Sequence, residues 1–337
     1  MTVAIKKVGA DIGEAVSAAM DLARYEDFIP RGSTVYLKVN LGWDLFLPGS
    51  VTNPAFFEAV VLKLKGYAGK LFVVESDQVL ENVEKAYRKS RISEIAERLD
   101  VPWINLSRGG RVIRYMPSNK IMKEVSVPAI LSEGVTVTLP VMKTHGKSTV
   151  TLSLKNQWGC LPKMRHMYHL DLTEAIADVN AAVGVKFAVV DGTIAMEGNG
   201  PKTGILREVG IVGAGADLVE VDAVFARLMG FDPRGIAHLV EAERRGIGKI
   251  GVDYVGDRID DMKPFKPAGH NIVSRVELAC RRSFLRALIF ETPLFMLMVA
   301  GAKIYYYFYE LVKGKKTRRH YRKCGAYGAY FSRSKRR

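Results

Sequence analysis

Short apolar runs alternate along the chain with segments whose apolar residues recur at helical spacing, and this alternation limits the fold more than any other feature. The runs rich in β-branched and aromatic residues are 34–39, 71–75, 135–139, 186–191 and 208–212. Segments with helical spacing and acidic or proline starts cover 54–65, 79–99, 171–183 and 217–229. This order predicts an α/β fold with a mainly parallel sheet flanked by helices.

The composition is that of a folded globular protein. The chain has 337 residues, of which 48% are hydrophobic and 25% are charged. Its three cysteines are too few and too scattered for a disulfide framework, so we predict a cytoplasmic protein. Charged residues near the first methionine interrupt any apolar run, and we therefore predict that no signal peptide is present.

The basic charge is concentrated near the end of the chain. Residues 275–337 hold 16 Lys and Arg against three Glu, a net charge of +13, whereas residues 1–274 carry a net charge of only +2. We accordingly predict an α/β domain over 1–274, an apolar and aromatic helical segment over 275–312, and a basic tail over 313–337. A nearly neutral body argues against an enzyme whose main groove binds nucleic acid.

Polar residues stand where the predicted strands end. Lys38 and Asn40 follow one strand, Glu75–Asp77 a second, Lys143–His145 a third and Asp191–Gly192 a fourth. In open α/β sheets, ligands bind outside the carboxyl ends of the strands. The sequence therefore predicts a functional site at this edge of the sheet.

The segment from 138 to 204 is rich in hydrogen-bond donors and glycine. The predicted anion-binding residues are Lys38, Asn40, Lys143, Lys155, Asn156, Gly198 and Gly200, with Lys147 as a further donor. Ammonium, amide and backbone N–H groups can hold a carboxylate or a phosphate. The alternative is that the lysines are solvated, that Asn156 caps a turn and that the GNGP sequence is a flexible loop.

Imidazole and carboxylate groups in the same region suggest acid–base chemistry. The predicted catalytic residues are His145, His169, Asp191 and Glu197, and a divalent metal would be held by His145, His169 or Asp191. The pair His166 and His169 has a spacing that matches no standard zinc signature, and Cys160 is interpreted as a small buried hydrophobe. The sequence has no G-x-S-x-G, P-loop or G-x-G-x-x-G motif.

Seven of these segments together resemble the domain of unknown function 362 family. They are LKVN (37–40), TNP (52–54), MKTHG (142–146), SLKNQWGCLP (153–162), His169 with DLTEAIADV, VVDGTIAMEGNGP (189–201) and AGADLVEVDAVFARLMG (214–230). The resemblance implies an α/β domain with one polar cleft, and it adds Asp222 as a site-supporting residue. Many relatives carry ferredoxin-type cysteine motifs that this chain lacks. No iron–sulfur cluster is therefore expected from its own cysteines, and redox chemistry would need an external redox partner or a bound cofactor.

The segment 283–312 is apolar and aromatic, but its longest uncharged run is the 11 residues Thr292–Ala302. A spanning helix needs about 20 such residues, so the pattern favours an interfacial segment over a spanning one. Basic residues flank both ends, which favours the cytoplasmic face of the membrane. We predict that residues 283–337 attach the protein peripherally to a membrane. The alternatives are a helix packed on the body, and a tail that binds RNA or another polyanion.

Two functional hypotheses from different classes follow for the body. The first is an enzyme that performs acid–base chemistry, metal-assisted or redox-linked, on a small anionic metabolite at the membrane surface. The second is a non-catalytic ligand- or cofactor-binding module in which the same residues only hold the ligand. A carboxylate and an imidazole within hydrogen-bond distance would favour the first hypothesis.

Overall fold

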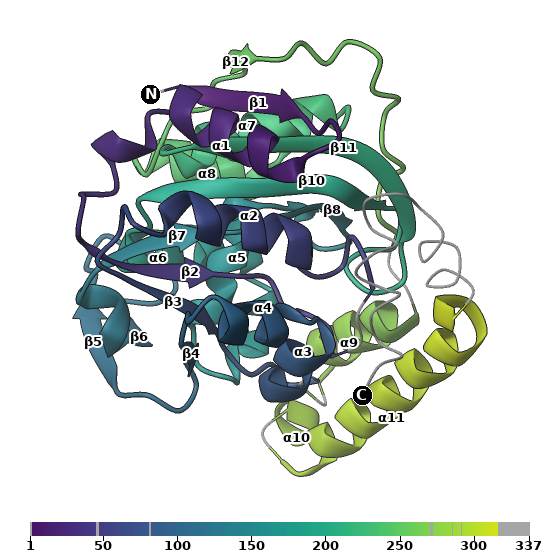
Figure 1. Ribbon diagram of the computed structural model, residues 1–337. Coiled ribbons are helices and arrows are strands. Elements are labelled where there is room, and N and C mark those ends of the chain that lie inside the picture. The colour runs from purple at the N-terminus through teal and green to yellow at the C-terminus, as the bar shows by residue number, and fades with distance from the viewer. Residues whose placement is uncertain are drawn as a thin grey trace.

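A mixed β-sheet with helices on both faces forms the body of the protein in the computed structural model (Figure 1). The structure describes residues 2–44, 47–80, 82–269, 272–284, 286–290 and 292–315. The main sheet has the strand order β12-β1-β11-β10-β7-β2-β3-β4, and β8 pairs with both β10 and β9. Strands β7, β2, β3 and β4 are parallel, whereas β11 runs antiparallel to β1 and β10. The predicted α/β class is therefore confirmed.

The strands are short except for the two that form a long hairpin. Their bounds are β1 (Val3–Lys7), β2 (Thr34–Lys38), β3 (Lys70–Glu75), β4 (Trp103–Asn105), β5 (Arg111–Tyr115), β6 (Glu124–Pro128), β7 (Val135–Thr138), β8 (Val141–His145), β9 (Thr149–Thr151), β10 (Phe187–Glu197), β11 (Ile205–Gly215) and β12 (Tyr254–Gly256). Strands β5 and β6 form a separate two-stranded sheet.

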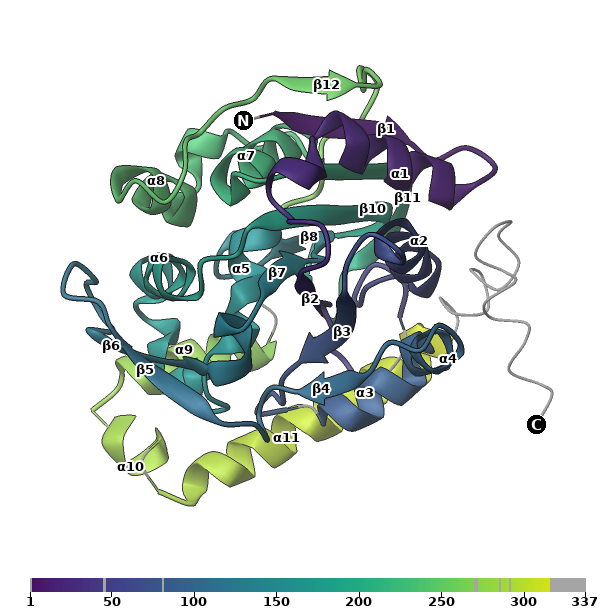
Figure 2. The same ribbon diagram turned by 60° about the vertical axis from the view of Figure 1, so that its left-hand side comes forward.

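The helices of the body cover the two faces of the sheet (Figure 2). One layer consists of α1 (Ile12–Leu22), α2 (Pro54–Leu64), α3 (Val83–Lys89) and α4 (Ile92–Arg98); the other consists of α5 (Ser153–Asn156), α6 (Leu172–Val183), α7 (Leu218–Leu228) and α8 (Ala237–Arg244). The 3₁₀ turns are η1 (Tyr25–Asp27), η2 (Ala129–Ser132), η3 (Gln157–Cys160), η4 (Arg165–His169) and η5 (Pro233–Gly235).

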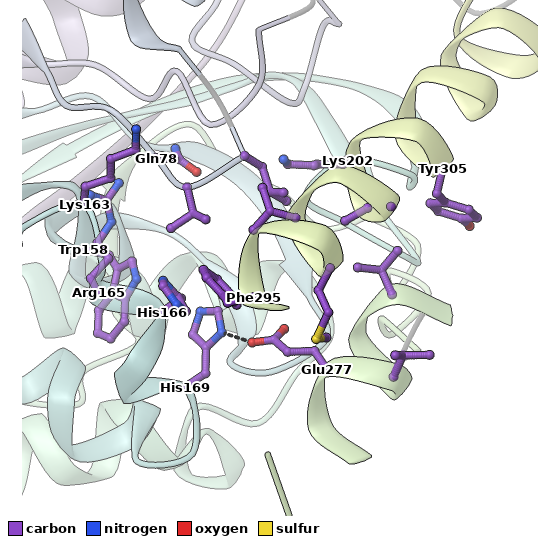
Figure 3. A pocket seen from close by; sticks show the side chains of 18 of the residues that line it. Gln78, Trp158, Lys163, Arg165, His166, His169, Lys202, Glu277, Phe295 and Tyr305 are labelled. Atoms are coloured by element: carbon purple, nitrogen blue, oxygen red, sulfur yellow. Dashed lines mark hydrogen bonds and ion pairs between the residues drawn. The ribbon is translucent and has the colours of Figure 1, made fainter. Parts of the chain in front are cut away.

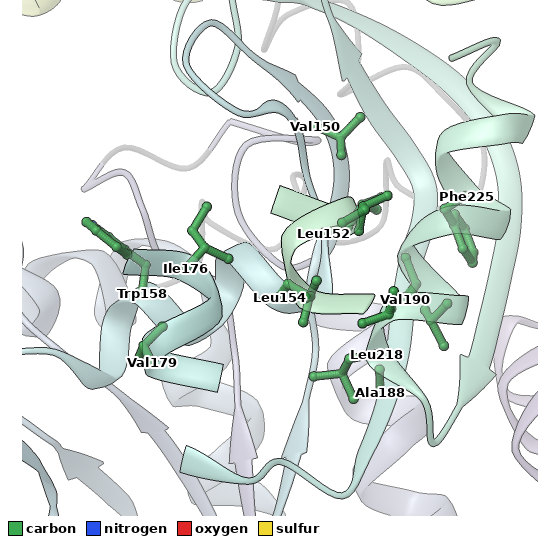
Figure 4. Close-up of a cluster of buried hydrophobic side chains, with 14 of the residues drawn as sticks. Val150, Leu152, Leu154, Trp158, Ile176, Val179, Ala188, Val190, Leu218 and Phe225 are labelled. Carbon is green, nitrogen blue, oxygen red and sulfur yellow. The ribbon is translucent and has the colours of Figure 1, made fainter. Parts of the chain in front are cut away.

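Each face of the sheet has its own hydrophobic core. Val35 and Leu37 of β2 pack with α1 and α2, while Val190 of β10 packs on the opposite side with α5 to α7. Figure 4 shows this second core, in which Leu154 and Phe225 approach the sheet. Burial on both faces explains why the strands contain nearly continuous apolar runs.

Two sequence predictions about the elements were wrong. The segment 79–99 forms two short helices, because Arg91 between them has a φ of 67°, which breaks a continuous helix. The strand predicted over 186–191 continues to Glu197 as one arm of the β10–β11 hairpin. Asp191 therefore lies in the middle of a strand, and only the segment between Glu197 and Ile205 is a loop.

The C-terminal helices pack along one side of the body (Figures 1 and 2). They are α9 (Ile272–Arg282), α10 (Arg286–Phe290), α11 (Leu294–Tyr309) and the π-helical turn η6 (Glu310–Gly314). One face of α11 is buried through Phe295, Val299 and Tyr306. Its other face exposes large apolar side chains, including Leu297 at 69% and Phe308 at 62%.

No helix within the described ranges is long and apolar enough to cross a membrane. Helix α11 has 16 residues, and a helix of that length is about 24 Å long at 1.5 Å per residue. The hydrocarbon core of a bilayer is about 30 Å thick.

Candidate functional site

Two adjoining cavities lie at the carboxyl ends of β2, β3 and β8. The small cavity has a volume of about 110 Å³ and is lined by polar residues such as Lys38, Asn40, Glu75, Lys143 and Asn156. The large cavity, of about 540 Å³, lies between this edge of the body and helices α9 and α11 (Figure 3). The two cavities share the lining residues Gln78, His145, Lys155, Trp158, Arg165 and Lys202. They therefore form one continuous site.

A buried ion pair forms one wall of the small cavity. Lys38 at the end of β2 and Glu75 at the end of β3 are almost fully buried, and Lys38 Nζ donates to Glu75 Oε2 at 2.7 Å. The backbone of Gly159 passes directly over this pair: a Cβ atom there would lie 2.5 Å from Glu75 Oε1 and 2.7 Å from Lys38 Nζ. Glycine is therefore required at position 159 for the backbone to approach the pair so closely.

Lys143 in β8 is buried and is held by neutral oxygens. Its Nζ donates to Asn40 Oδ1 at 2.8 Å and to the Ser50 carbonyl at 2.6 Å. Burial lowers the pKa of Lys143 to about 7, although the negative charges of Asp191 and Glu75 oppose this shift. An anion in the cavity would stabilise the charged form of this lysine.

Lys155 is buried in the helical turn α5, and its Nζ lies 4.4 Å from the centre of the Trp158 ring. No carboxylate forms an ion pair with it among the residues that the structure describes. Burial, together with the charges of Arg165, Lys147 and Lys143, keeps the pKa of Lys155 well below its usual range. The charged form of this buried amine lacks a counterion, and an anion bound beside it would stabilise the ammonium form.

Asp222 of α7 supports the turn that carries Lys155. Its carboxylate accepts hydrogen bonds from Ser153 N at 2.7 Å and Leu154 N at 2.9 Å. These bonds satisfy N–H groups at the start of α5, where a carboxylate is favourable. Asp222 is thus a positioning residue and lines neither cavity.

Arg165 and Lys202 add two more cations to the shared lining. Arg165 is 5% exposed and donates to the carbonyls of Asp77 and Leu161. Lys202 lies over the rings of Trp43 and Tyr306, at 4.3 and 5.0 Å from their centres. Because Tyr306 belongs to α11, this contact joins the C-terminal helix to the site.

His145, at the end of β8, faces both cavities with a fixed ring orientation. Its Nδ1 accepts hydrogen bonds from the backbone N–H groups of Lys147 and Ser148, at 3.1 and 3.2 Å. The proton of the neutral ring must then be on Nε2. Burial and the nearby lysines hold the pKa of His145 well below its usual range. In this tautomer the Nε2–H group of His145 is a hydrogen-bond donor.

His169 has the opposite arrangement, because a carboxylate contacts its Nδ1. Glu277 Oε1 of α9 lies 2.7 Å from His169 Nδ1, as Figure 3 shows. Lys147 Nζ donates to the other carboxylate oxygen at 2.7 Å. Lys147 Nζ also lies 2.9 Å from His169 Nδ1, and because an ammonium group only donates, the two contacts require opposite tautomers. We assign the proton to Nδ1, because the contact with Glu277, which only accepts, is the shorter one. This tautomer leaves the Nε2 lone pair available. Burial lowers the pKa of His169 to about 4, so the ring is neutral at pH 7.

The structure thus brings together most of the predicted anion-binding residues, namely Lys38, Asn40, Lys143, Lys155 and Asn156, together with His145. His169 lines only the large cavity. Asn40 and Asn156 are joined side chain to side chain at 3.0 Å.

Four predicted site residues line neither cavity. Asp191 accepts from Asn53 N at 2.8 Å at the start of α2, and burial raises its pKa to about 6. Glu197 lies 3.4 Å from Arg207 at the end of β10. Gly198 and Gly200 shape the hairpin loop, which contributes Pro201 and Lys202 to the small cavity.

No group of three or more His, Cys, Asp or Glu side chains that could hold a metal ion occurs in the described part of the chain. His145, His169 and Asp191, the predicted metal ligands, do not form such a group. Cys160 is fully buried, and burial raises the pKa of its thiol to about 11. A protonated, inaccessible thiol agrees with its interpretation as a small hydrophobe.

Several lining residues were missed by sequence reasoning. Trp158 and Arg165 lie within or just after the SLKNQWGCLP segment, and Lys202 follows the GNGP sequence, so their proximity to predicted residues was an available signal. Glu277 offered no such signal, because it lies in the basic C-terminal segment.

Comparison with known proteins places these features in a family. A relative from Synechocystis that is named a thylakoid-associated protein is 28% identical over 241 residues, which cover 67% of this chain and 72% of the relative. A crystal structure of a protein from Thermotoga maritima aligns with a TM-score of 0.39 and 10% identity, over 71% of this chain and 61% of that one. The model of the family described as "Domain of unknown function (DUF362)" matches residues 35–227. This chain therefore belongs to the DUF362 family.

Proposed function

We propose that this protein binds a small anionic molecule in the two adjoining cavities. The observation that carries the proposal is the excess of buried cations: Lys143, Lys155 and Arg165 face the small cavity, whereas Glu75 already pairs with Lys38. Buried charges without counterions are unfavourable, and a carboxylate or phosphate group supplies the missing negative charge. The Nε2–H of His145 adds a neutral donor at the same place.

The chemistry that best fits the bound anion is proton transfer by His169. Its free Nε2 can accept a proton from the ligand, and Glu277 then stabilises the imidazolium through Nδ1–H. The proton returns to the ligand or to solvent when the ring is deprotonated again. An anion bound beside Lys155 offsets one of the charges that lower the pKa of His169, which strengthens the base.

The site would work at a membrane surface, which the protein contacts through the exposed face of α11. Leu297, Ile304 and Phe308 are each more than half exposed there, and 11 Lys and Arg without any acidic residue follow in 313–337. Apolar contact and attraction to anionic lipids reinforce each other. The name of the thylakoid-associated relative agrees with this location. Binding of RNA by the basic tail concerns residues that lie largely outside the described ranges.

Thermal unfolding with simple anions tests the binding proposal. We expect pyrophosphate and citrate to raise the Tm of the purified protein above its value in chloride of equal ionic strength, because a ligand of the folded state stabilises it. Lys155→Met should remove this increase, whereas the matched change Lys186→Met, at an exposed position, should retain it. Equal Tm values in all these anions would contradict an anion site.

A second experiment separates catalysis from binding alone. Small anions that copurify with the protein are identified by mass spectrometry and then incubated with fresh protein in D₂O. Proton transfer by His169 predicts that deuterium enters the ligand with the natural protein and not with His169→Gln. Tight binding without deuterium incorporation would favour the non-catalytic binding module.

A further inference from the structure

We propose that the ligand of this site is an amphiphile, with an anionic head group in the small cavity and a single apolar chain in the large one. This inference rests on the proposed anion site and specifies the class of molecule that occupies it. The small cavity is lined mainly by polar residues, whereas the large cavity adds a group of apolar side chains to charged residues such as Lys163 and Glu277.

The polar groups gather at one end of the combined site. Lys38, Asn40 and Lys143 line only the small cavity, and the shared lining contributes His145, Lys155 and Arg165. A volume of about 110 Å³ is enough for a small head group and not for a larger metabolite. The head group of the ligand is therefore compact and negatively charged.

The other end of the site is a wall of apolar side chains. Val273 and Val276 of α9 face Phe295, Met298 and Val299 of α11 across the large cavity. These residues leave about 540 Å³ of space, which is within the range of about 300–1,000 Å³ that holds one small ligand. A polar metabolite would gain nothing from such a wall, whereas an alkyl or isoprenoid chain is removed from water there.

The lining of the large cavity carries an unsatisfied polar atom beside the apolar wall. His166 is 9% exposed and lines the large cavity, and its ring stacks on Phe295 with 4.4 Å between the ring centres. Its Nδ1 is buried and has no hydrogen-bond partner among the described atoms. Buried polar groups usually have a partner, so a ligand in the large cavity that carries one polar group along its apolar chain suits this position.

The apolar wall is an addition to the family domain. The family match ends at residue 227, whereas the residues of the wall come from 273–305. Lys38, Lys143 and Lys155 lie within the residues that match the family. The anion site thus belongs to the domain, and the C-terminal helices convert it into a site for a longer, partly apolar molecule.

The test compares inorganic phosphate with straight-chain alkyl monophosphates, from ethyl to dodecyl phosphate, by calorimetry below their critical micelle concentrations. We expect the affinity to rise about fourfold per added methylene until the chain fills the large cavity, because each buried methylene contributes about 0.8 kcal/mol. If phosphate and every alkyl phosphate bind equally, the amphiphile proposal is wrong while the anion site stands. If none of them binds, the proposed function itself fails.

A pair of matched variants tests where the alkyl chain of the ligand lies. Ala302→Phe places a ring in the large cavity. It should abolish the rise in affinity with the length of the alkyl chain and leave the affinity for inorganic phosphate unchanged. Ala300→Phe makes the same change on the exposed side of α11 and should keep the gain. If the affinity of Ala302→Phe still rises with the length of the alkyl chain, that chain lies outside the large cavity and the proposal is wrong.

Such a molecule can come from a bilayer or from solution, and a competition experiment distinguishes the sources. Vesicles of phosphatidylcholine that contain lysophosphatidic acid, a phosphate monoester with one acyl chain, are added to the protein bound to decyl phosphate. Displacement by these vesicles, and not by vesicles of phosphatidylcholine alone, identifies a membrane lipid as the source. If neither vesicle displaces decyl phosphate, the ligand is a soluble amphiphile of the same chemistry.

Discussion

His169 Nδ1 and Glu277 Oε1 lie 2.7 Å apart although 108 residues separate them in the chain. His169 belongs to the family domain, whereas Glu277 belongs to α9, beyond the end of the family match. Burial alone would raise the pKa of Glu277, but the hydrogen bond from His169 and the charge of Lys147 lower it below its usual range. The C-terminal helices therefore help to build the candidate site.

This contact predicts opposite tautomers for two histidines of the site. His169 should carry its proton on Nδ1, facing Glu277, whereas His145 should carry its proton on Nε2. Long-range ¹H–¹⁵N correlation spectra of histidine-labelled protein distinguish the two forms. The variants His145→Gln and His169→Gln assign the signals by their loss. Finding the Nε2–H form at His169 would remove its role as a base.

Anion binding should weaken as the pH rises above 7. In the free protein, Lys143 has a pKa of about 7, so its charged fraction falls above that pH. The groups that act on it are Asp191 and Glu75, which raise its pKa, and Lys202 and Lys38, which lower it. An anion binds the ammonium form, so binding takes up protons and the affinity falls by up to tenfold per pH unit for one linked proton.

Calorimetry with pyrophosphate in buffers of different ionisation enthalpy measures this proton uptake directly. The prediction is wrong if the affinity stays constant between pH 6 and pH 9 and the binding heat does not depend on the buffer. Anion binding would then protonate no buried lysine.

Gly159→Ala should damage both the fold and the site. The added methyl group would lie within 2.5 to 2.9 Å of Glu75 and Lys38 and must displace the buried ion pair. We expect a loss of about 1–3 kcal/mol in the free energy of unfolding, as for other overpacked positions, with weaker pyrophosphate binding. Gly109→Ala is the matched control, because a Cβ there has no neighbour within 4 Å. Urea unfolding curves measure both variants, and equal stabilities would contradict the close approach.

The exposed face of α11 should mediate membrane binding. We expect the double change Leu297→Ser and Phe308→Ser to lower the partition onto anionic vesicles at least tenfold at high salt, because each apolar side chain contributes about 1.5–3 kcal/mol when buried. The control pair Ile113→Ser and Tyr115→Ser removes equally exposed apolar groups from β5 and should bind normally. Vesicle flotation measures all three proteins, and equal flotation would assign the attachment to another surface.

These point substitutions test membrane binding more specifically than deletion of the whole C-terminal segment. From the sequence alone, deleting residues 283–337 is expected to release a folded body from the membrane. In the structure, the same deletion removes Phe295, Val299 and Tyr306, which are buried. It would also remove one wall of the large cavity, so a loss of ligand binding would follow for a reason unrelated to the membrane.

The sequence predicted the polar edge of the sheet well, because strand order places the ends of neighbouring parallel strands together. Lys38 is the last residue of β2, whereas Lys143 lies within β8, a strand that the sequence did not predict; both line the small cavity. Asp191 misled the prediction, since the Asp-Gly pair after an apolar run is typical of a turn, whereas β10 continues through it. The role of Glu277 could not be predicted from local sequence patterns, because its contact with His169 arises from the packing of α9 on the body.

Helix α11 contributes one side to the large cavity and leaves the other side open to the surroundings. A ligand that favours one position of this helix changes the apolar area on the exposed face of the helix. In the same way, a lipid surface that favours one position of the helix changes the shape of the cavity. Thermodynamic linkage requires the two effects to be equal in size. If the ligand tightens attachment to vesicles by a given factor, the vesicles must tighten ligand binding by that same factor.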